Sequence, residues 1–430
     1  MAISGWAVLL SLAGVVVVGV APGWGTVGVW LGGVVAAVAV DAALAGSPHR
    51  VRIVRRGGGS VRLGEQTTSE LLLTNVGRRA VRGVLRDAWQ PSAGAMVTRH
   101  RLDLPPSERR RVVTTLRPTR RGDRLADRVT IRSWGPLRLG ARQASLPVPG
   151  TLRVLPPFTS RRHLPSKLAR LRELDGRASV QVRGQGTEFD SLREYVEGDD
   201  VRSIDWRATA RRQQVVVRTW RPERDRRVVL VLDTSRTSAA RVGDAPRLDA
   251  AMDAALLLGA LASRAGDRVD LLAVDRRVRA AVSGATGAAL LPALVNAMAP
   301  LEPELVEADW PYVVGEVRRR LTQRALVVLL TPLEAAAVEE GLLPVAPQLT
   351  RLHTVLVASV ADPAVHAMAR RRGTSVDVYS AAAAERGELD RQAVTAGLVR
   401  AGAEVVDASP SSLPPRLADA YLALKAAGRL

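Results

Sequence analysis

Two apolar runs at the amino terminus most constrain what this chain can fold into. Residues 3–21 carry no charge, and after a turn at "PGWGT" a second apolar run covers residues 27–45. A helix of roughly 20 apolar residues can cross the hydrocarbon core of a bilayer, which is about 30 Å thick. We therefore predict a two-helix transmembrane hairpin over residues 1–47, followed by a soluble part.

The residues that flank the two runs predict the side of the membrane on which the soluble part lies. Three tryptophans, whose rings favour the membrane interface, lie near the run ends: Trp6, Trp24 and Trp30. Four arginines follow within residues 50–56, and arginine-rich flanks stay in the cytosol. A cleaved signal peptide is the alternative, but no basic residue precedes the first run and a second run follows it. We expect a multi-pass protein of the cell membrane with a cytosolic soluble part.

Asp41 is an acid inside the second run, four residues before its end. An acid within a membrane segment can mark an ion or proton path. An acid this close to the interface usually reaches water, and we favour that simpler interpretation.

Composition narrows the classes of function. Aromatic residues make up only 3% of the 430 residues, so few rings are available to stack on nucleic-acid bases. The net charge of +20 comes almost entirely from arginine, because the only lysines are Lys167 and Lys425. Coding that is rich in GC produces such a bias, so we expect no specific nucleic-acid partner. The absence of cysteine excludes disulfides, thiolate metal sites and a cysteine nucleophile.

Short runs separated by Gly, Pro, Asn or Asp occupy residues 51–149. Among them "SELLLTNVG", "RRVVTTL" and "DRVTIRSWG" have spacings that suit strands and hairpins. We predict a small antiparallel β-rich domain over residues 50–155. It contains no cluster of His, Asp or Glu at ligand spacing, so we expect a structural or partner-binding role.

A linker, a helix and an acidic segment are expected over residues 156–227. The stretch "RVLPPFTS" is typical of a linker, and leucines at helical spacing follow it up to Gly176. In "GTEFDSLREYVEGDDVRSIDW" three apolar residues share one helical face: Phe189, Leu192 and Val196. We predict a helix there that stops at Gly198, and a second short helix capped by Asp199 or Asp200.

The same segment holds seven acids and two arginines between residues 188 and 205. Carboxylates this dense can pair with nearby arginines, bind a cation or face a basic protein partner. We expect Arg193 and Arg202 to pair inside the segment, which leaves a minority of its acids for function.

A dense pattern of residues runs through this segment: Gly184, Gly186, Glu188, Phe189, Arg193, Glu194, Tyr195, Gly198, Asp199, Asp200, Arg202, Asp205 and Trp206. The pattern resembles the signature of the bacterial and archaeal family called domain of unknown function 58. The resemblance implies a membrane-anchored protein whose cytosolic part has a von Willebrand factor A-type fold. Because such proteins are often encoded beside a MoxR-type AAA+ ATPase, it also implies that ATPase as a partner. No catalytic activity is established for the family.

The carboxy-terminal half alternates strand-like and helix-like stretches. Runs such as "VVLVLD", "DRVDLLAVD", "ALVVLLT" and "HTVLVASV" suit buried strands, and "RVRAAV" suits a hairpin partner of the second. Helices are expected over residues 247–265, 288–299 and 311–323. This alternation predicts an open, Rossmann-like α/β sheet, and with the resemblance a von Willebrand factor A-like domain over residues 228–430.

A candidate metal site follows the first of these strands. Asp233, Ser235 and Thr237 form the pattern Asp-x-Ser-x-Thr, close to the Asp-x-Ser-x-Ser of a metal-ion-dependent adhesion site. One carboxylate and two hydroxyls are hard oxygen ligands that suit Mg²⁺ and leave a coordination position for a partner's acid. The alternative is that Asp233 and Ser235 only cap the following turn.

The resemblance implies two further ligands, a Thr from a second loop and an Asp after the fourth strand. Here that strand is followed by Thr331 and Pro332 where the acid is wanted. Thr286 is the candidate for the second-loop ligand, and Glu334 is the candidate substitute for the acid.

Familiar catalytic motifs are missing from the sequence. Neither lysine stands in a Gly-Lys-Ser/Thr context, which argues against a P-loop. The five histidines lie at least thirteen positions apart, so no His-Glu-x-x-His zinc helix occurs. We therefore expect a non-enzymatic, membrane-anchored adaptor or scaffold for the ATPase.

Two other functions are compatible with the sequence. One is a divalent-cation-dependent hydrolase that uses Glu188, Asp199, Asp200 or Asp205. The other is binding of anionic lipid or nucleic acid through arginines, for which residues 50–56 are the best local case.

Overall fold

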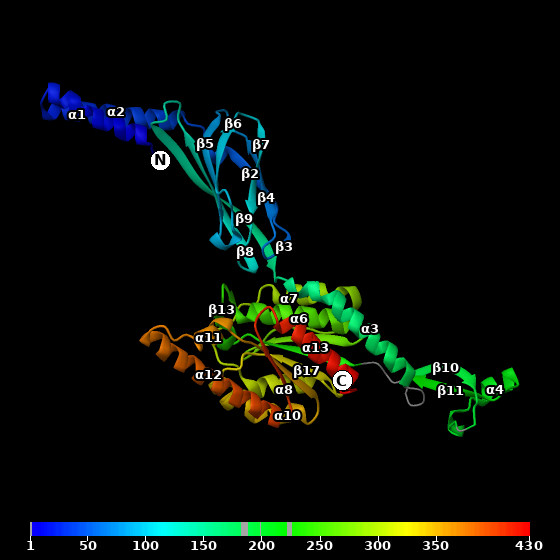
Figure 1. The fold of residues 1–430 in the computed structure, drawn as a ribbon. Coiled ribbons are helices and arrows are strands. Elements are labelled where there is room, and N and C mark those ends of the chain that lie inside the picture. The colour runs from blue at the N-terminus through cyan, green and yellow to red at the C-terminus, as the bar shows by residue number, and fades with distance from the viewer. Residues whose placement is uncertain (1, 182–187, 198, 222–225) are drawn as a thin grey trace. The chain divides into compact units, whose positions relative to one another are not determined.

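The structure, a computed structural model, describes residues 2–181, 188–197, 199–221 and 226–430 of the chain (Figure 1). It divides into two compact units, Met1–Pro157 and Phe158–Leu430. The boundary follows the proline pair of the predicted linker.

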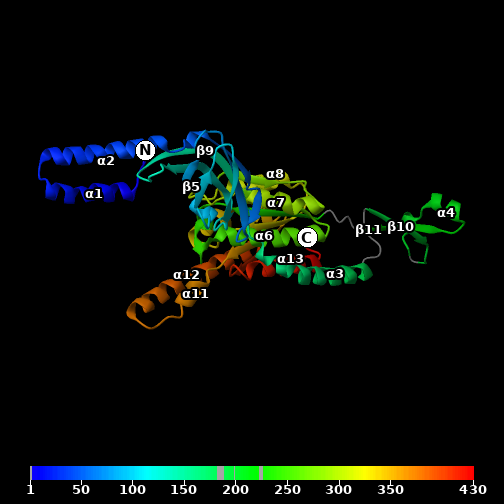
Figure 2. The ribbon, with the colours of Figure 1, turned by 90° about the horizontal axis from the view of Figure 1, so that it is seen from above.

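Two apolar helices begin the first unit, α1 (Gly5–Val20) and α2 (Trp24–Leu44). They lie side by side in both views of the chain (Figure 1 and Figure 2). The indole N–H of Trp30 in α2 donates to the carbonyl oxygen of Leu10 in α1 at 3.2 Å. The same ring covers Gly14, where an added Cβ would lie 2.3 Å from it, so this close approach requires glycine.

One described helix, Trp24–Arg50, is long and apolar enough to cross a membrane, with a mean hydropathy of 2.0. The helix α1 is also apolar, but it has only 16 residues. The described part of the chain therefore contains one candidate membrane span near the amino terminus, where the sequence predicts two.

Two β-sheets form the rest of the first unit. The larger has the order β1-β9-β8-β5-β6, with β3 paired to β9, and the smaller has the order β2-β4-β7. The strands are β1 (Ala2–Ile3), β2 (Val51–Gly57), β3 (Ser60–Arg62), β4 (Thr67–Asn75), β5 (Val81–Trp89), β6 (Arg99–Leu104), β7 (Arg109–Leu116), β8 (Gly122–Trp134) and β9 (Gly140–Leu155). Side chains from both sheets share one apolar cluster, which includes Leu71 of β4 and Ile131 of β8. The two sheets therefore pack face to face as a sandwich.

A buried ion pair also joins the two sheets. Arg55 of β2 lies 2.7 Å from Asp87 of β5, and their side chains are 6% and 0% exposed. Arg55 also donates to the hydroxyl of Ser69, while Trp89 and Thr114 donate to Asp87. A buried charge without partners is costly, so this network fixes how the sheets face each other. Because Arg55 is held in this buried pair, it is not available to bind lipid headgroups with the other arginines of residues 50–56.

Asp41 does not reach water, contrary to the interpretation favoured from the sequence. Its side chain lies in the last part of α2 and is only 1% exposed. The carboxylate accepts hydrogen bonds from the backbone N–H groups of Leu137 at 2.8 Å, Leu139 at 2.8 Å and Gly140 at 2.9 Å. All three lie in or beside the turn between β8 and β9. The turn approaches α2 closely, because a Cβ on Gly135 would lie 2.2 Å from the Asp41 carbonyl oxygen. Asp41 thus fastens the helix to the sandwich.

The second unit begins with a short 3₁₀ turn, Thr159–His163, and the helix α3 (Leu164–Gln181). The helix runs past Gly176, where the sequence predicts its end. Leu171 is buried, and α3 contacts the helix α6 (Arg247–Arg264), so the leucine stripe serves packing.

The predicted helix around residues 189–196 is wrong. The structure has the strand β10 (Glu188–Glu194), which pairs antiparallel with β11 (Val216–Arg221). Three apolar residues at helical spacing are a weak signal, and pairing with β11 gives this segment a hydrogen-bond ladder, with one register shift between Phe189 and Ser191. A 3₁₀ turn, Val201–Ser203, and the helix α4 (Trp206–Arg212) connect the two strands. We call residues 188–221 the acidic arm.

A six-stranded open sheet forms the core of the second unit. Its order is β16-β15-β12-β17-β18-β19, with the edge strand β16 antiparallel to β15 and the other pairs parallel. The strands are β12 (Arg227–Asp233), β15 (Arg268–Val274), β16 (Val278–Val282), β17 (Leu326–Leu330), β18 (Thr354–Val360) and β19 (Glu404–Ala408). Two minor strands, β13 (Arg241–Val242) and β14 (Ala245–Pro246), form a separate hairpin. The mixed α/β class predicted from the alternation is confirmed.

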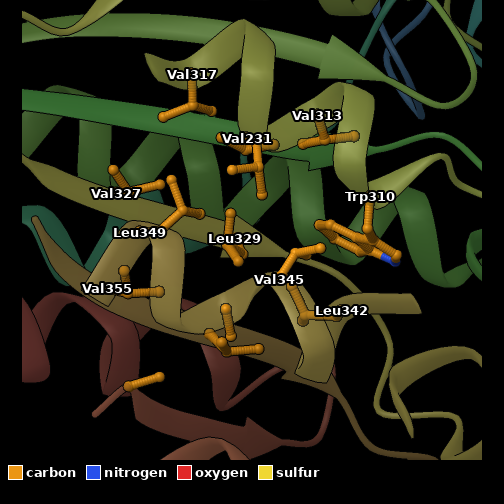
Figure 3. Packing of buried hydrophobic residues seen from close by; sticks show 14 of the residues in the cluster. Val231, Trp310, Val313, Val317, Val327, Leu329, Leu342, Val345, Leu349 and Val355 are labelled. Carbon is orange, nitrogen blue, oxygen red and sulfur yellow. The ribbon is translucent and has the colours of Figure 1, made fainter. Parts of the chain in front are cut away.

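Helices cover both faces of this sheet. Their bounds are α5 (Arg236–Ala239), α6 (Arg247–Arg264), α7 (Leu290–Met298), α8 (Trp310–Arg320), α9 (Ala335–Ala337), a π-helical turn (Val338–Leu342), α10 (Leu343–Thr350), α11 (Pro363–Met368), α12 (Ser375–Arg400) and α13 (Leu413–Ala426). The helix α6 contacts β12, β15, α7 and α13 on one face. On the other face α8 and α10 pack on β12, β17 and β18 through a cluster of Val and Leu (Figure 3). Trp310 lies at the edge of that cluster (Figure 3).

Candidate functional site

The candidate site lies where the strand order of the open sheet reverses. From β12 the chain proceeds to β15 and β16 on one side, and later returns to β17 on the other side of β12. Loops after neighbouring parallel strands diverge at such a point, and ligands of open α/β sheets bind there. Asp233 ends β12, and Thr331 follows the end of β17, whose Leu330 is paired with Leu232. The pairing therefore brings the two side chains together.

Asp233 is the centre of a small hydrogen-bonded cluster. Its Oδ1 accepts a hydrogen bond from the backbone N–H of Ser235 at 2.8 Å. Its Oδ2 accepts from the hydroxyls of Thr331 at 2.7 Å and Thr237 at 3.3 Å. The hydroxyls of Ser235 and Thr237 lie 3.1 Å apart. The pattern Asp-x-Ser-x-Thr therefore gathers around one carboxylate, together with a third hydroxyl that comes from 98 positions away.

The cluster is almost closed to solvent. The exposed fractions of Asp233, Ser235 and Thr237 are 3%, 1% and 9%. Burial raises the pKa of Asp233, and this effect outweighs the hydrogen bonds from Thr331, Ser235 and Thr237 that act in the opposite direction. A cation beside the carboxylate would favour the ionised form.

A small cavity of about 20 Å³ opens beside the cluster. Its lining comprises Asp233, Ser235, Thr237, Glu307, Ala308, Trp310, Thr331, Pro332, Ala337 and Val338. A cavity of this size holds one water molecule or one ion. Trp310 belongs to both the cavity wall and the apolar cluster under α8, so the cavity floor rests on the core. We call this cavity the hydroxyl pocket.

The donor atoms of the hydroxyl pocket fit a hard cation. Oxygen atoms from one carboxylate and three hydroxyls converge on it, and Mg²⁺ is commonly held by one or two carboxylates with water filling the other positions. Across the described residues, no three His, Cys, Asp or Glu side chains are grouped so that they could hold a metal. A cation here would therefore rely on hydroxyl and water ligands, with Asp233 supplying the charge.

The two substitutes considered from the sequence lie outside the hydroxyl pocket. Glu334 forms an ion pair with Arg247, the first residue of α6. Thr286 precedes a 3₁₀ turn and is not among the lining residues. The sequence reasoning did not identify Thr331 or Glu307 as members of the site. The carboxyl end of β17 was the available signal for Thr331, whereas nothing in the sequence marks Glu307.

A second buried carboxylate supports the loop after β12. Asp275, which follows β15, is 2% exposed and accepts hydrogen bonds from the hydroxyl of Thr234 at 3.0 Å and from Arg279 at 2.8 Å. Burial pushes the pKa of Asp275 up, but Arg279, Thr234 and two backbone N–H groups more than offset it and the pKa is lowered. Asp275 is therefore ionised at neutral pH and holds Thr234, the neighbour of Asp233, in place.

The acids of the acidic arm mostly hold its own backbone. Asp199 lies 2.5 Å from Arg193 and accepts from the N–H of Val196, and the hydrogen bond from Arg193 is the main reason that its pKa is lowered. Asp200 caps the 3₁₀ turn by accepting from the N–H of Arg202 at 2.9 Å. The pairing expected for Arg193 is present, and the cap expected of Asp199 or Asp200 is made by Asp200.

Asp205 has a similar role at the start of α4. It accepts from the N–H groups of Arg207 and Ala208, both at 3.0 Å, and pairs with Arg218 of β11 at 2.9 Å. The N–H of Ala208 and then Arg218 lower its pKa. Within the described chain no carboxylate lies within ion-pair distance of Arg202, contrary to expectation. The acids on either side of Arg202 in the sequence have other roles, because Asp200 caps the 3₁₀ turn and Asp205 pairs with Arg218.

The other residues of the family pattern are placed as follows. The backbone N–H of Tyr195 donates to Val215 at 2.8 Å, and the side chain of Trp206 is 69% exposed. Glu194 ends β10, and the structure describes only the backbone of Glu188 and Phe189. Gly184, Gly186 and Gly198 lie outside the described residues. The described members of the pattern from Glu188 to Trp206 lie in the arm, but no described part of it gathers the carboxylates that a metal-dependent hydrolase needs.

Comparison with solved structures gives only distant likenesses to parts of the chain. A CARDB domain from Pyrococcus furiosus is 14% identical, covers 22% of this chain and 93% of its own length, and has a TM-score of 0.17. A PapD-like domain of human CEP192 is also 14% identical, covers 24% of this chain and 84% of its own, with a TM-score of 0.17. At TM-scores this low the likeness establishes neither fold nor function.

Sequence comparison gives the family. Uncharacterized proteins of Mycobacterium tuberculosis and Mycobacterium bovis are each 27% identical over 194 residues, which is 42% of this chain and 57% of theirs. The chain thus spans little more than half the length of the curated relatives it matches. Residues 191–402, from within the acidic arm to just past the end of α12, match the profile of a family described as protein of unknown function DUF58. Over these residues the chain belongs to the DUF58 family.

Proposed function

We propose that the protein is a non-enzymatic, membrane-anchored adaptor that binds an acidic side chain of a partner protein at the hydroxyl pocket. The observation that carries the proposal is the convergence of Asp233, Ser235, Thr237 and Thr331 at the reversal point of the sheet. A Mg²⁺ ion held there supplies the positive charge that a partner's carboxylate seeks.

The proposal includes a von Willebrand factor A-like fold for the open sheet. Two features support it, the order of the six strands with an antiparallel edge at β16 and the pattern Asp-x-Ser-x-Thr after the first strand.

We also propose that both α1 and α2 cross the membrane. The strand β1 pairs with the start of β9, and the N–H of Ser4 donates to the carbonyl of Leu139 at 3.1 Å. The two ends of the helical hairpin therefore meet at the same turn of the sandwich, as two antiparallel spans require. The 16 residues of α1 reach roughly 24 Å, so the bilayer must thin slightly around it. Exposed Arg50, Arg52 and Arg56 favour a cytosolic sandwich.

The acidic arm is the second proposed contact surface. Asp199, Asp200 and Asp205 serve as caps and ion pairs, and the arm exposes several apolar side chains among its charged ones. The exposed fractions of Val196, Val201 and Trp206 are 61%, 63% and 69%. Exposed apolar side chains on a small hairpin are suited to a protein partner.

The family resemblance points to a MoxR-type AAA+ ATPase as the partner. The test is purification of the tagged full-length protein from detergent-solubilised membranes of its own host. We expect an AAA+ ATPase to co-elute with the wild type and with the control Asp390→Ala, and to decrease several-fold with Asp233→Ala. Asp390 forms only an exposed pair with Arg386, so it is a matched acid away from the pocket. If no AAA+ ATPase elutes with the wild type, or if Asp233→Ala retains the same amount, the adaptor proposal fails.

A further inference from the structure

The loop between α7 and α8 places an acid of this chain at the mouth of the hydroxyl pocket. Glu307 is one of the lining residues. Its carboxylate forms an ion pair with Arg236, which stands between Ser235 and Thr237 in the sequence. The side chains of Arg236 and Glu307 are 56% and 50% exposed, so the pair lies at the solvent boundary of the pocket.

The backbone of this loop is held to the loop after β12. The N–H of Arg236 donates to the carbonyl of Val306 at 2.9 Å, and the N–H of Glu304 donates to the carbonyl of Thr234 at 2.8 Å. The side chain of Glu304 pairs with Arg279 at 2.9 Å. After Glu307, the N–H of Asp309 donates to the carbonyl of Asp275 at 3.2 Å. The backbone is therefore fixed on both sides of Glu307, while its side chain can swing out without moving the loop.

We propose that Arg236, with the hydroxyls of Ser235 and Thr237, forms a carboxylate-binding subsite, and that Glu307 occupies it in place of a partner's acid. The inference rests on the proposed function and adds the residue that recognises the partner. A guanidinium beside hydroxyl donors suits a carboxylate, because charge-assisted hydrogen bonds to Arg are strong and directional. The chain's net charge of +20 also favours an acidic partner surface.

Because the ion pair between Arg236 and Glu307 is partly exposed, another carboxylate can take the place of Glu307. An exposed ion pair is weak because water screens it and its side chains lose freedom when they pair. A carboxylate that also contacts the buried hydroxyls, or a cation held by them, gains interactions that are better shielded from water. Such an acid displaces Glu307 from Arg236. Because Glu307 competes for the same position, it lowers the apparent affinity of the subsite for any acid that binds less well.

The test measures binding of a fluorescein-labelled pentapeptide that carries two glutamates spaced by glycine. Fluorescence anisotropy is recorded with the full-length protein in detergent, and the same peptide with glutamines is the uncharged probe. Glu307→Gln removes the competing charge at nearly constant size. Glu385→Gln is the matched control, because Glu385 pairs with Arg372 at similar exposure, 53% and 56%, outside the pocket lining. Unchanged thermal melting shows that each variant is folded.

We expect Glu307→Gln to bind the acidic peptide several-fold more tightly than the wild type, and Glu385→Gln to match the wild type. Adding Arg236→Gln to Glu307→Gln should abolish the gain. Equal or weaker binding by Glu307→Gln overturns the inference, as does a gain that survives the loss of Arg236 or that the glutamine peptide shares.

Repeating the titrations with Mn²⁺ and with EDTA separates this inference from the proposed function. Suppose that Glu307→Gln binds the peptide more tightly in EDTA but no variant binds Mn²⁺. This result would support the carboxylate-binding subsite and contradict the bridging cation of the proposed function. Suppose instead that Mn²⁺ binding requires Asp233, but Glu307→Gln leaves the peptide affinity unchanged. This result would support the cation site and overturn the carboxylate-binding subsite.

Discussion

Thr331 shows how one buried hydroxyl can decide the state of a carboxylate. It donates to Asp233 at 2.7 Å, the shortest of the hydroxyl contacts that Asp233 accepts, and its exposed fraction is 5%. Without it, Oδ2 of Asp233 keeps only the longer contact with Thr237. The hydroxyl of Thr331 therefore stabilises the ionised form against the effect of burial.

Thr331→Val should destabilise the protein by about 1–3 kcal/mol, because a buried carboxylate oxygen loses its best donor at nearly constant side-chain volume. It should also weaken binding of any cation that needs Asp233 ionised. Chemical denaturation of the detergent-solubilised protein measures the first effect. Thr395→Val, whose hydroxyl bonds only to its own helix at Arg391, is the control and should change stability much less. An equal effect of both variants would contradict the role assigned to Thr331.

The buried ring of His353 should make the folded protein less stable as the pH falls. Burial lowers its pKa below 6.5, and Arg318 and Arg324 add to the shift. In the unfolded chain the ring protonates near pH 6.5, whereas the folded protein resists that proton. The unfolded state therefore binds more protons as the pH falls from 7, and stability is lost until the folded-state pKa is passed.

His353→Phe should flatten the pH dependence of unfolding between pH 7 and pH 5, because the variant has no proton to take up at this position. Urea unfolding at several pH values measures the slope. His366→Phe, at an exposed position of α11, should keep the wild-type slope. The same slope in the wild type and in His353→Phe would show that other groups cause the acid loss.

Among the structural elements, the strands of the open sheet were predictable and the acidic arm was not. Continuous runs of Val and Leu mark β12, β15, β17 and β18, because a parallel sheet buried on both faces needs no polar alternation. The strand β10 depends on pairing with β11, a contact between segments more than twenty residues apart, which a local pattern does not encode. The local helical spacing therefore gave the wrong element.

The side chain of Asp41 accepts three of the hydrogen bonds that attach α2 to the sandwich. Asp41→Asn should lower stability by about 2 kcal/mol, because an amide has one acceptor oxygen and cannot serve all three N–H groups. Hydrogen exchange should quicken at Leu137, Leu139 and Gly140, while the core strands keep their protection. Asp127→Asn, which replaces an exposed acid of β8, is the control. Unchanged exchange at the turn in Asp41→Asn would refute the fastening role.

At the scale of the whole molecule, the site combines residues that only the sheet order brings together. The pattern Asp-x-Ser-x-Thr could be recognised because its three residues lie within five consecutive positions, 233–237. Thr331 and Glu307 join it through the neighbouring strand β17 and the loop before α8, and neither relation is visible before the strand order is known. The family match, in contrast, could be anticipated from the dense residue pattern of the acidic arm.

The central claim is that the hydroxyl pocket binds a divalent cation through Asp233. The most direct measurement is a calorimetric titration of Mg²⁺ into the full-length protein in detergent, with Asp233→Ala and the control Asp390→Ala in parallel. We predict saturable one-site binding in the wild type and in Asp390→Ala, and its loss in Asp233→Ala. No saturable binding in the wild type, or equal binding in Asp233→Ala, would contradict the claim.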